Sequence, residues 1–169
     1  MKEKDLNTVI NNSFKCLGFS HKISDPMGGQ GSQNPFDGFS VCFDQAWYWE
    51  SKLIKEGYYA FNFNKIEEHQ WGNLLRIKKE MPTANCVIIV GFWASRSFFE
   101  YLVFDVVCLW KMKNQGQKSI KKTELEKLRK KGYNMIIKKN KNTNKLMTEN
   151  MEAIQNKIIT CEVLQHADS

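Results

Sequence analysis

The order of hydrophobic patterns along the chain predicts an α/β (α+β) fold in which a mixed β-sheet is flanked by helices. A helical pattern comes first, a group of strand patterns and a second helical pattern follow, and further strands lie beyond them. The chain has 169 residues, of which 42% are hydrophobic. That length suffices for one domain with a proper core, so we expect a single domain overall.

The first half of the chain contains the predicted hairpin. Residues 3–17 carry apolar side chains at helical spacing and predict an amphipathic helix. Residues 24–38 are rich in Gly, Pro, Ser and Asn and predict a loop. Two runs rich in aromatic and β-branched residues, 39–45 and 46–54, predict paired strands, and a third strand is predicted at 58–63.

The second half of the chain is predicted to contain three helices and three more strands. The helices are expected at residues 65–81, 121–131 and 146–160, the first ended by Pro82. The strands are expected at residues 85–93, 98–104 and 133–137. The run 85–93 is apolar throughout, which is typical of a strand buried on both faces. Residues 138–145 contain no apolar side chain, and we expect them to be mobile.

Positive charge is concentrated in one segment. Residues 111–145 hold thirteen Lys or Arg and two Glu, a net charge of +11, whereas the whole chain carries +7, so the remainder carries −4. Such a run is most often a solvated or disordered face, and the alternative is a surface for a polyanion. The chain has three arginines, so its positive charge consists mainly of lysines, which favour salt-sensitive contact with phosphates over reading of base edges.

Several classes of protein are disfavoured by the sequence. The N-terminus is charged rather than apolar, and the longest apolar run, residues 86–94, is too short to cross a bilayer, so we expect a cytoplasmic protein without membrane contact. The five cysteines are widely spread, which favours reduced thiols over disulfides or zinc sites. The Gly-rich loop lacks the Lys-Ser/Thr ending of a phosphate-binding loop.

Two charged residues lie inside a strongly apolar predicted strand. Glu50 and Lys52 are two positions apart, so their side chains project from the same face. Burying either one alone would cost several kcal/mol unless it is paired or ligated. A structural salt bridge is the ordinary explanation. The tripeptide itself carries little weight, because about two acid-x-Lys patterns are expected by chance in so Lys-rich a chain, and this is the only one. The surrounding residues must therefore distinguish a structural salt bridge from a functional site.

Asp37 supplies a second carboxylate near Glu50. A hairpin that turns near residues 44–46 places Asp37 roughly opposite Glu50. Two carboxylates and an ammonium at one sheet edge suit phosphodiester hydrolysis. The carboxylates would hold Mg²⁺, which Mn²⁺ can replace, with the backbone carbonyl of Ser51 as a third ligand, and the metal would lower the pKa of a bound water. Lys52 would orient or deprotonate that water.

The chain here resembles a known family. The pattern P-x-D-G, thirteen residues before E-S-K, resembles the PD-(D/E)xK nucleases, and FNFNKIEEHQWGNL (61–74), NCVIIVGF and FFEYLVFDVVCLW resemble RecU-type Holliday junction resolvases. The resemblance covers about residues 35–112. It implies a restriction-endonuclease-like sheet, a nuclease core at residues 1–112 and a basic helical C-terminal extension, residues 113–169, packed on or following it.

The resemblance also implies roles for particular residues. Asp37 and Glu50 would bind the metal, Lys52 would be catalytic, and Gln70 would lie beside the active site, contacting the phosphate or the lysine. Family members often place an acidic residue on the first helix. Here Glu3 or Asp5 would have to reach the metal, or that ligand is missing. The residues expected to contact DNA are His69, Lys55, Lys121, Lys122, Arg129, Lys130 and Lys131.

The function that the resemblance implies is that of a Mg²⁺-dependent endodeoxyribonuclease that cleaves branched DNA as a Holliday junction resolvase. Symmetric cleavage of a two-fold junction needs two active sites, which a homodimer provides. Two alternatives remain open. One is a restriction-type or phage-borne endonuclease of the same superfamily that cuts duplex DNA. The other is a non-catalytic DNA-binding protein in which the charged residues form a structural ion pair.

Overall fold

The computed structural model describes residues 2–23, 34–54, 60–93, 98–139 and 145–167. Eight strands form one mixed sheet, and its members are β1 (Phe19–Lys22), β2 (Gly38–Cys42), β3 (Gln45–Ile54), β5 (Asn85–Trp93), β6 (Phe98–Asp105), β8 (Met135–Lys139), β9 (Leu146–Thr148) and β10 (Ile158–Ile159). Their order is β1-β2-β3-β5-β6-β8-β9, with β10 paired to β6. Two further strands, β4 (Ala60–Asn62) and β7 (Ser119–Lys121), form a separate ribbon.

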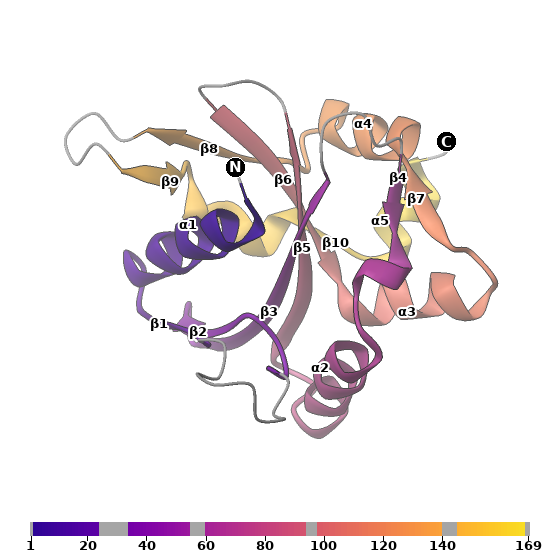
Figure 1. The fold of residues 1–169 in the computed structure, drawn as a ribbon, viewed down its shortest axis with the longest axis horizontal. Coiled ribbons are helices and arrows are strands. Elements are labelled where there is room, and N and C mark those ends of the chain that lie inside the picture. The colour runs from indigo at the N-terminus through magenta and orange to yellow at the C-terminus, as the bar shows by residue number, and fades with distance from the viewer. Residues whose placement is uncertain (1, 24–33, 55–59, 94–97, 140–144, 168–169) are drawn as a thin grey trace.

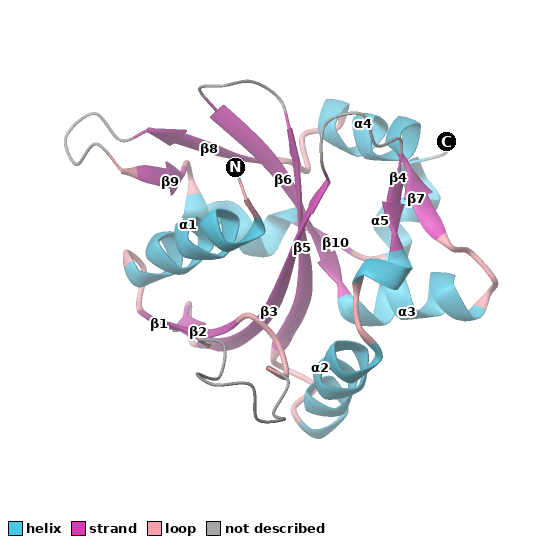
Figure 2. Ribbon diagram, in the orientation of Figure 1, coloured by secondary structure: helices cyan, strands magenta, loops and turns pink. Residues whose placement is uncertain are grey.

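Helices cover both faces of this sheet, which confirms the predicted α/β fold class. The helical elements are α1 (Glu3–Lys15), η1 (Phe63–Lys65), α2 (Glu68–Glu80), α3 (Val106–Asn114), α4 (Lys122–Lys130), η2 (Met151–Lys157) and α5 (Cys161–Ala167). The helix α1 and the 3-10 helix η2 lie on one side of the sheet, and α2, α3, α4 and α5 lie on the other (Figures 1 and 2).

The two faces of the sheet bury separate apolar clusters. Phe14 of α1 packs against Trp47 and Trp49 of β3, with ring centroids 5.5 and 6.5 Å apart. Ile54 of the same strand belongs to the opposite cluster, with residues of α2, α3 and α4. Side chains alternate along a strand, so Glu50 shares the α2 face with Ile54. Burial of each large ring stabilises the fold by roughly 2 to 3 kcal/mol.

The predicted hairpin is confirmed. Gly38 pairs with Trp49 and Cys42 pairs with Gln45, and the two turn residues, Phe43 and Asp44, both adopt positive φ. On its other edge β3 runs parallel to β5 from Trp47 to Ile54, and β5 is antiparallel to β6. The strand predicted at residues 85–93 is therefore central, and its middle is buried on both faces.

The predicted helix at residues 146–160 is wrong. Its first residues form β9, which pairs with β8, and Asn150 then adopts the left-handed conformation with φ of 48°. The chain continues as η2 and as β10, which runs parallel to β6. The apolar residues at helical spacing are explained by η2, whose Met151 and Ile154 are buried. Pairing with β8 and β6 is a long-range contact that local spacing does not encode.

The strand predicted at residues 58–63 is only partly found. Of that range, residues 58 and 59 lie outside the described residues, and β4 pairs with β7 instead of joining the main sheet. Phe61 lies opposite Ile120 in this ribbon, and both are fully buried. The short strand β1 was not predicted. Residues 113–169 contribute β7, β8, β9 and β10 as well as helices, so they are part of the fold and not only a helical extension.

Some sequence predictions concern residues that the structure does not describe. They are most of the Gly-rich loop, residues 24–33, and residues 140–144 of the stretch expected to be mobile. Among the residues described, no helix has the length and apolar character needed to span a bilayer.

Candidate active site

The site lies where β3 continues beyond β2. Strand β2 pairs with β3 only as far as Trp49, so the edge of β3 from Glu50 onward faces side chains. The backbone N–H of Ser51 donates to Oδ2 of Asp37 at 2.8 Å, and the Ser51 hydroxyl lies 3.2 Å from the same oxygen. The paired register, extended by one residue, places Asp37 opposite Glu50, as the sequence predicted.

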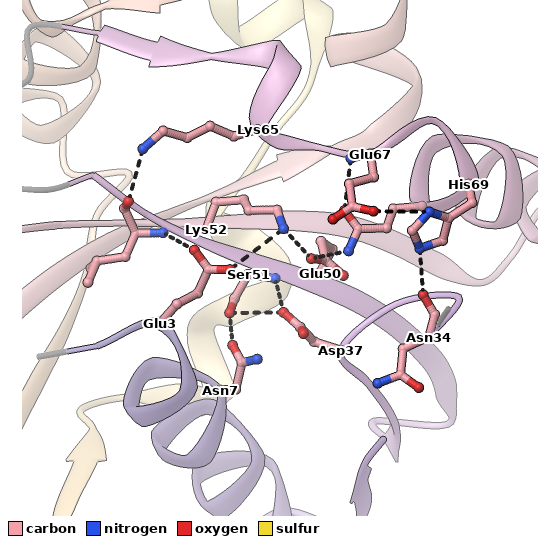
Figure 3. Close-up of polar contacts among 12 residues, drawn as sticks. Glu3, Asn7, Asn34, Asp37, Glu50, Ser51, Lys52, Lys65, Glu67 and His69 are labelled. Carbon is pink, nitrogen blue, oxygen red and sulfur yellow. Dashed lines mark hydrogen bonds and ion pairs between the residues drawn. The ribbon is translucent and has the colours of Figure 1, made fainter. Parts of the chain in front are cut away.

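Glu50 is the centre of the site. Its side chain is 1% exposed, and its Oε1 accepts hydrogen bonds from Nζ of Lys52 and Nε2 of Gln70, each at 2.7 Å (Figure 3). Its Oε2 is buried and has no hydrogen-bond partner. The structure thus brings Glu50, Lys52 and Gln70 together, and it leaves one buried carboxylate oxygen unsatisfied, which is costly in the absence of a ligand.

The start of α2 fixes the orientation of Gln70. Its Oε1 accepts the backbone N–H of Glu67 at 3.0 Å, which closes the capping box at the N-terminus of the helix. The amide nitrogen is therefore the end that faces Glu50. Gln70 contacts the carboxylate of Glu50, whereas the sequence had suggested the phosphate or the lysine as its partner.

Helix α1 contributes Glu3, one of the two acidic residues that the sequence offered for the site. Oε1 of Glu3 lies 3.6 Å from Nζ of Lys52, and its Oε2 accepts the backbone N–H of Leu53 at 3.3 Å (Figure 3). Asp5 instead accepts the backbone N–H of Lys2, where it caps the helix. Glu3 is thus the acidic residue of the first helix that reaches the site.

The edge of β3 offers main-chain groups to the site. Leu53 donates its N–H to Glu3 and accepts Nζ of Lys65 on its carbonyl at 3.3 Å, so both groups face this edge. Ser51 has the same orientation, because residues two apart in a strand present their N–H and C=O to the same side. Its carbonyl therefore faces the edge that carries Asp37, as a metal ligand would. Lys65 was not predicted.

Burial raises the pKa of both carboxyl groups. The pKa of Glu50 is raised to about 8, chiefly by burial and then by the charge of Asp37, while the charge of Lys52 and its hydrogen bond act in the opposite direction. Burial also raises the pKa of Asp37, although hydrogen bonds from Ser51 and the charge of Lys52 act against it. Burial by itself would lower the pKa of Lys52, but attraction to Glu50, Glu3 and Asp37 outweighs it and leaves that pKa raised.

The raised pKa values of Glu50 and Lys52 imply different charge states for Glu50. A raised pKa at Lys52 rests on a negative Glu50, whereas a raised pKa at Glu50 means that this carboxyl retains its proton near neutral pH. Burial favours the protonated form of Glu50, because its Oε2 has no donor to stabilise a negative charge. A cation that supplied positive charge at that oxygen would favour the ionised form.

The residues present fit a hard divalent cation. Mg²⁺ is held through oxygen atoms, needs only one or two protein carboxylates and keeps several waters. Asp37, Glu50 and the carbonyl of Ser51 supply such a set, and the unsatisfied Oε2 of Glu50 is free to receive it. Within the described part of the chain, no three His, Cys, Asp or Glu side chains are arranged to hold a metal by themselves.

Two of the residues expected to contact DNA also form contacts within the protein. His69 lies 2.9 Å from the carbonyl of Asn34 and 3.4 Å from the carboxylate of Glu67, so it ties α2 to the segment that precedes Asp37 (Figure 3). Arg129 forms a bidentate pair with the buried carboxylate of Glu100, at 2.5 and 3.0 Å. That pairing raises the pKa of Arg129.

The remaining predicted contacts are more accessible. Lys121, Lys122, Lys130 and Lys131 are exposed, although Nζ of Lys131 donates to the carbonyl of His166 at 2.7 Å. Lys122 lies 3.9 Å from Glu126, an exposed pair of little energetic weight. Lys55 lies outside the described residues.

Comparisons with models of known protein families and with curated proteins found no match to this chain.

Proposed function

We propose that the protein is a Mg²⁺-dependent endodeoxyribonuclease of the PD-(D/E)xK type that cleaves branched DNA, with the four-way Holliday junction as its substrate. The observation that carries the proposal is the convergence of Asp37, Glu50, Lys52 and Gln70 at one strand edge, where a buried oxygen of Glu50 has no partner. A buried group left unsatisfied in this way is more common at functional sites than in ordinary cores.

Each group at the site has a role in phosphodiester hydrolysis. Asp37, Glu50 and the carbonyl of Ser51 would hold the cation, which when bound neutralises phosphate charge and activates water. Lys52 lies 2.7 Å from Glu50, so its Nζ stands beside whatever the carboxylates bind. There it can orient the attacking water and stabilise negative charge that develops on the phosphate. Gln70 holds the carboxylate of Glu50 in place.

The basic segment supports DNA as the substrate. Helix α4 lies on the same side of the sheet as α2 (Figure 1), the side on which Glu50 and Lys52 project, and its exposed Lys122 and Lys130 can contact the phosphate backbone. Lysines of this kind give binding that is salt-dependent and indifferent to sequence. Branch specificity would then come from the shape of the substrate.

A panel of substrates tests the proposal. The purified protein is incubated with a four-way junction, a flap, single-stranded DNA and linear duplex, with Mg²⁺, with Mn²⁺ and with EDTA. We expect metal-dependent nicking of the junction in preference to the duplex, and none by Asp37→Asn. Preferential cutting of linear duplex would favour a restriction-type or phage-borne endonuclease. Salt-sensitive binding with no cleavage of any substrate would favour a non-catalytic DNA-binding protein and overturn the proposal.

We further propose that the active form is a homodimer, because a two-fold junction presents two equivalent phosphodiesters to be cut. Analytical ultracentrifugation of the protein with a junction should give a complex containing two protomers. A complex with one protomer that nicks both strands independently would contradict the dimer.

A further inference from the structure

Helix α1 presents a stripe of polar side chains to the sheet. Glu3, Asn7 and Asn11 are spaced four residues apart and therefore lie on one face of the helix. Glu3 reaches Leu53 and Asn11 accepts a hydrogen bond from Ser20 at 2.8 Å. Asn7, which is only 7% exposed, contacts the hydroxyl of Ser51 through its Oδ1. Helix α1 is thus connected by Asn7 to the residue that holds Asp37.

The hydroxyl of Ser51 lies between two acceptors. Its Oγ contacts Oδ1 of Asn7 on one side and lies 3.2 Å from Oδ2 of Asp37 on the other (Figure 3). A serine hydroxyl has a single proton to donate. It can satisfy the amide oxygen of Asn7 or an ionised Asp37, but not both. A carboxylate that binds a metal must be ionised, so in that state the proton of Ser51 is needed by Asp37.

Asn7 can resolve this conflict because its side chain carries a donor as well as an acceptor. Rotation of the amide by half a turn exchanges its oxygen and nitrogen with almost no change in shape. The NH₂ group then donates to Oγ of Ser51, and the hydroxyl proton is free to bond to Asp37. An aspartate or a leucine at position 7 could not supply that donor, although leucine would fill a similar volume.

We infer that Asn7 is a positioning residue for the metal site: it donates through its amide to Ser51, which in turn donates to the metal-binding carboxylate of Asp37. The inference rests on the proposed function, because it takes Asp37 to be a metal ligand. Groups that orient a ligand in this indirect way typically alter metal affinity about 10- to 100-fold when removed. Asn7 touches neither the cation nor the substrate.

A double-mutant cycle tests the inference. The affinity of the DNA-free protein for Mn²⁺ is measured by calorimetry for the wild type, Asn7→Leu, Ser51→Ala and the double variant. We expect each single variant to bind Mn²⁺ about 10-fold more weakly. The double variant should bind no more weakly than Ser51→Ala, because Asn7 acts only through that hydroxyl. Losses that multiply in the double variant would overturn the inference.

Asn11→Leu is the matched control. Asn11 lies on the same stripe, is also 7% exposed, and bonds to Ser20 instead of Ser51. It should match Asn7→Leu in its effect on thermal stability and leave Mn²⁺ affinity unchanged. A similar loss of affinity in both variants would mean that any polar-to-apolar change on α1 disturbs the site, and the specific role of Asn7 would be lost.

A spectroscopic readout does not depend on activity. The side-chain amide resonances of Asn7, identified by their loss in Asn7→Leu, should shift on addition of Mg²⁺ as the amide changes partner, and those of Asn11 should not. Static Asn7 resonances at saturating Mg²⁺ would contradict the inference and leave the proposed nuclease intact. If the wild type bound neither Mg²⁺ nor Mn²⁺, the proposed function itself would fail.

Discussion

The buried carboxyl of Glu50 should make the stability of the metal-free protein strongly dependent on pH. Its pKa is about 8 in the folded chain and has an ordinary value of 4.5. Because the fold favours the protonated form, the associated stability is fully present below pH 4.5, declines as the pH rises, and is lost above pH 8. The free energy of unfolding should therefore fall by about 5 kcal/mol across this window.

Such a loss is comparable to the whole stability of a small domain, so urea denaturation in EDTA at half-unit steps from pH 5 to pH 9 will detect it. Glu50→Gln removes the ionisable group and should flatten most of the slope. Glu152→Gln, the same substitution at an exposed position in η2, should keep it. The pKa of Asp37 is also raised, so any slope that this group contributes should have the same sign.

Metal should reverse this pH dependence. A divalent cation binds the ionised carboxylates, so saturating Mg²⁺ should restore stability at pH 8 to 9 and have little effect at pH 5. Apparent metal affinity should rise with pH up to about 8 and then level off, in keeping with the pKa of Glu50. If the wild type and Glu50→Gln lose stability in parallel between pH 5 and pH 9, then Glu50 is not the buried titrating group and the reasoning is refuted.

Three further outcomes follow from the same geometry. Arg129→Ala should lower the free energy of unfolding by about 3 kcal/mol in urea titration, because it leaves a buried carboxylate unpaired; an unchanged midpoint would argue against that pair. Gln70→Leu should reduce the single-turnover cleavage rate about 10-fold without changing junction affinity, because Glu50 loses its amide donor; a loss of affinity alone would place Gln70 on the DNA. The double variant Lys122→Ala/Lys130→Ala should bind DNA of every sequence more weakly by the same factor. In a fluorescence titration, the salt dependence of its binding constant should be lower by about two ions. A loss of affinity that depends on DNA sequence would contradict contact with the phosphate backbone.

The hairpin and the relative positions of Asp37, Glu50 and Lys52 could be predicted from the sequence, because they depend on residues that are close together in the chain. Strand alternation placed Glu50 and Lys52 on one face, and the length of the turn placed Asp37 opposite Glu50. The structure confirms both placements. The fold class could be predicted for the same reason, since the order of helix and strand patterns restricts the layers that can form.

The parts that were missed depend on contacts between distant segments. Nothing in the spacing of residues 146–160 reveals that β8 and β6 have edges for β9 and β10 to pair with. Arg129 was expected to contact DNA, and the sequence did not reveal that Glu100, twenty-nine residues earlier on β6, pairs with it. A buried partner of this kind is visible only once the strands are placed.

The polar residues of α1 could have been recognised, but only in part. Glu3, Asn7 and Asn11 recur every four residues beside the apolar positions of the helix, and that spacing is the signal of a polar stripe on a packed helix face. The sequence shows the stripe and not its partners. Ser51 was predicted to act through its carbonyl, and its side chain was missed because a serine in a strand carries no distinguishing pattern.

Cleavage of a four-way junction by the wild type and by Lys52→Ala tests the central claim most directly. The two purified proteins are compared at saturating Mg²⁺ under single-turnover conditions, with junction binding measured in parallel in Ca²⁺. We predict Mg²⁺-dependent nicking by the wild type and a loss of at least 100-fold in rate for Lys52→Ala, with junction affinity retained. Undiminished cleavage by Lys52→Ala would contradict the assignment of the active site to Asp37, Glu50 and Lys52.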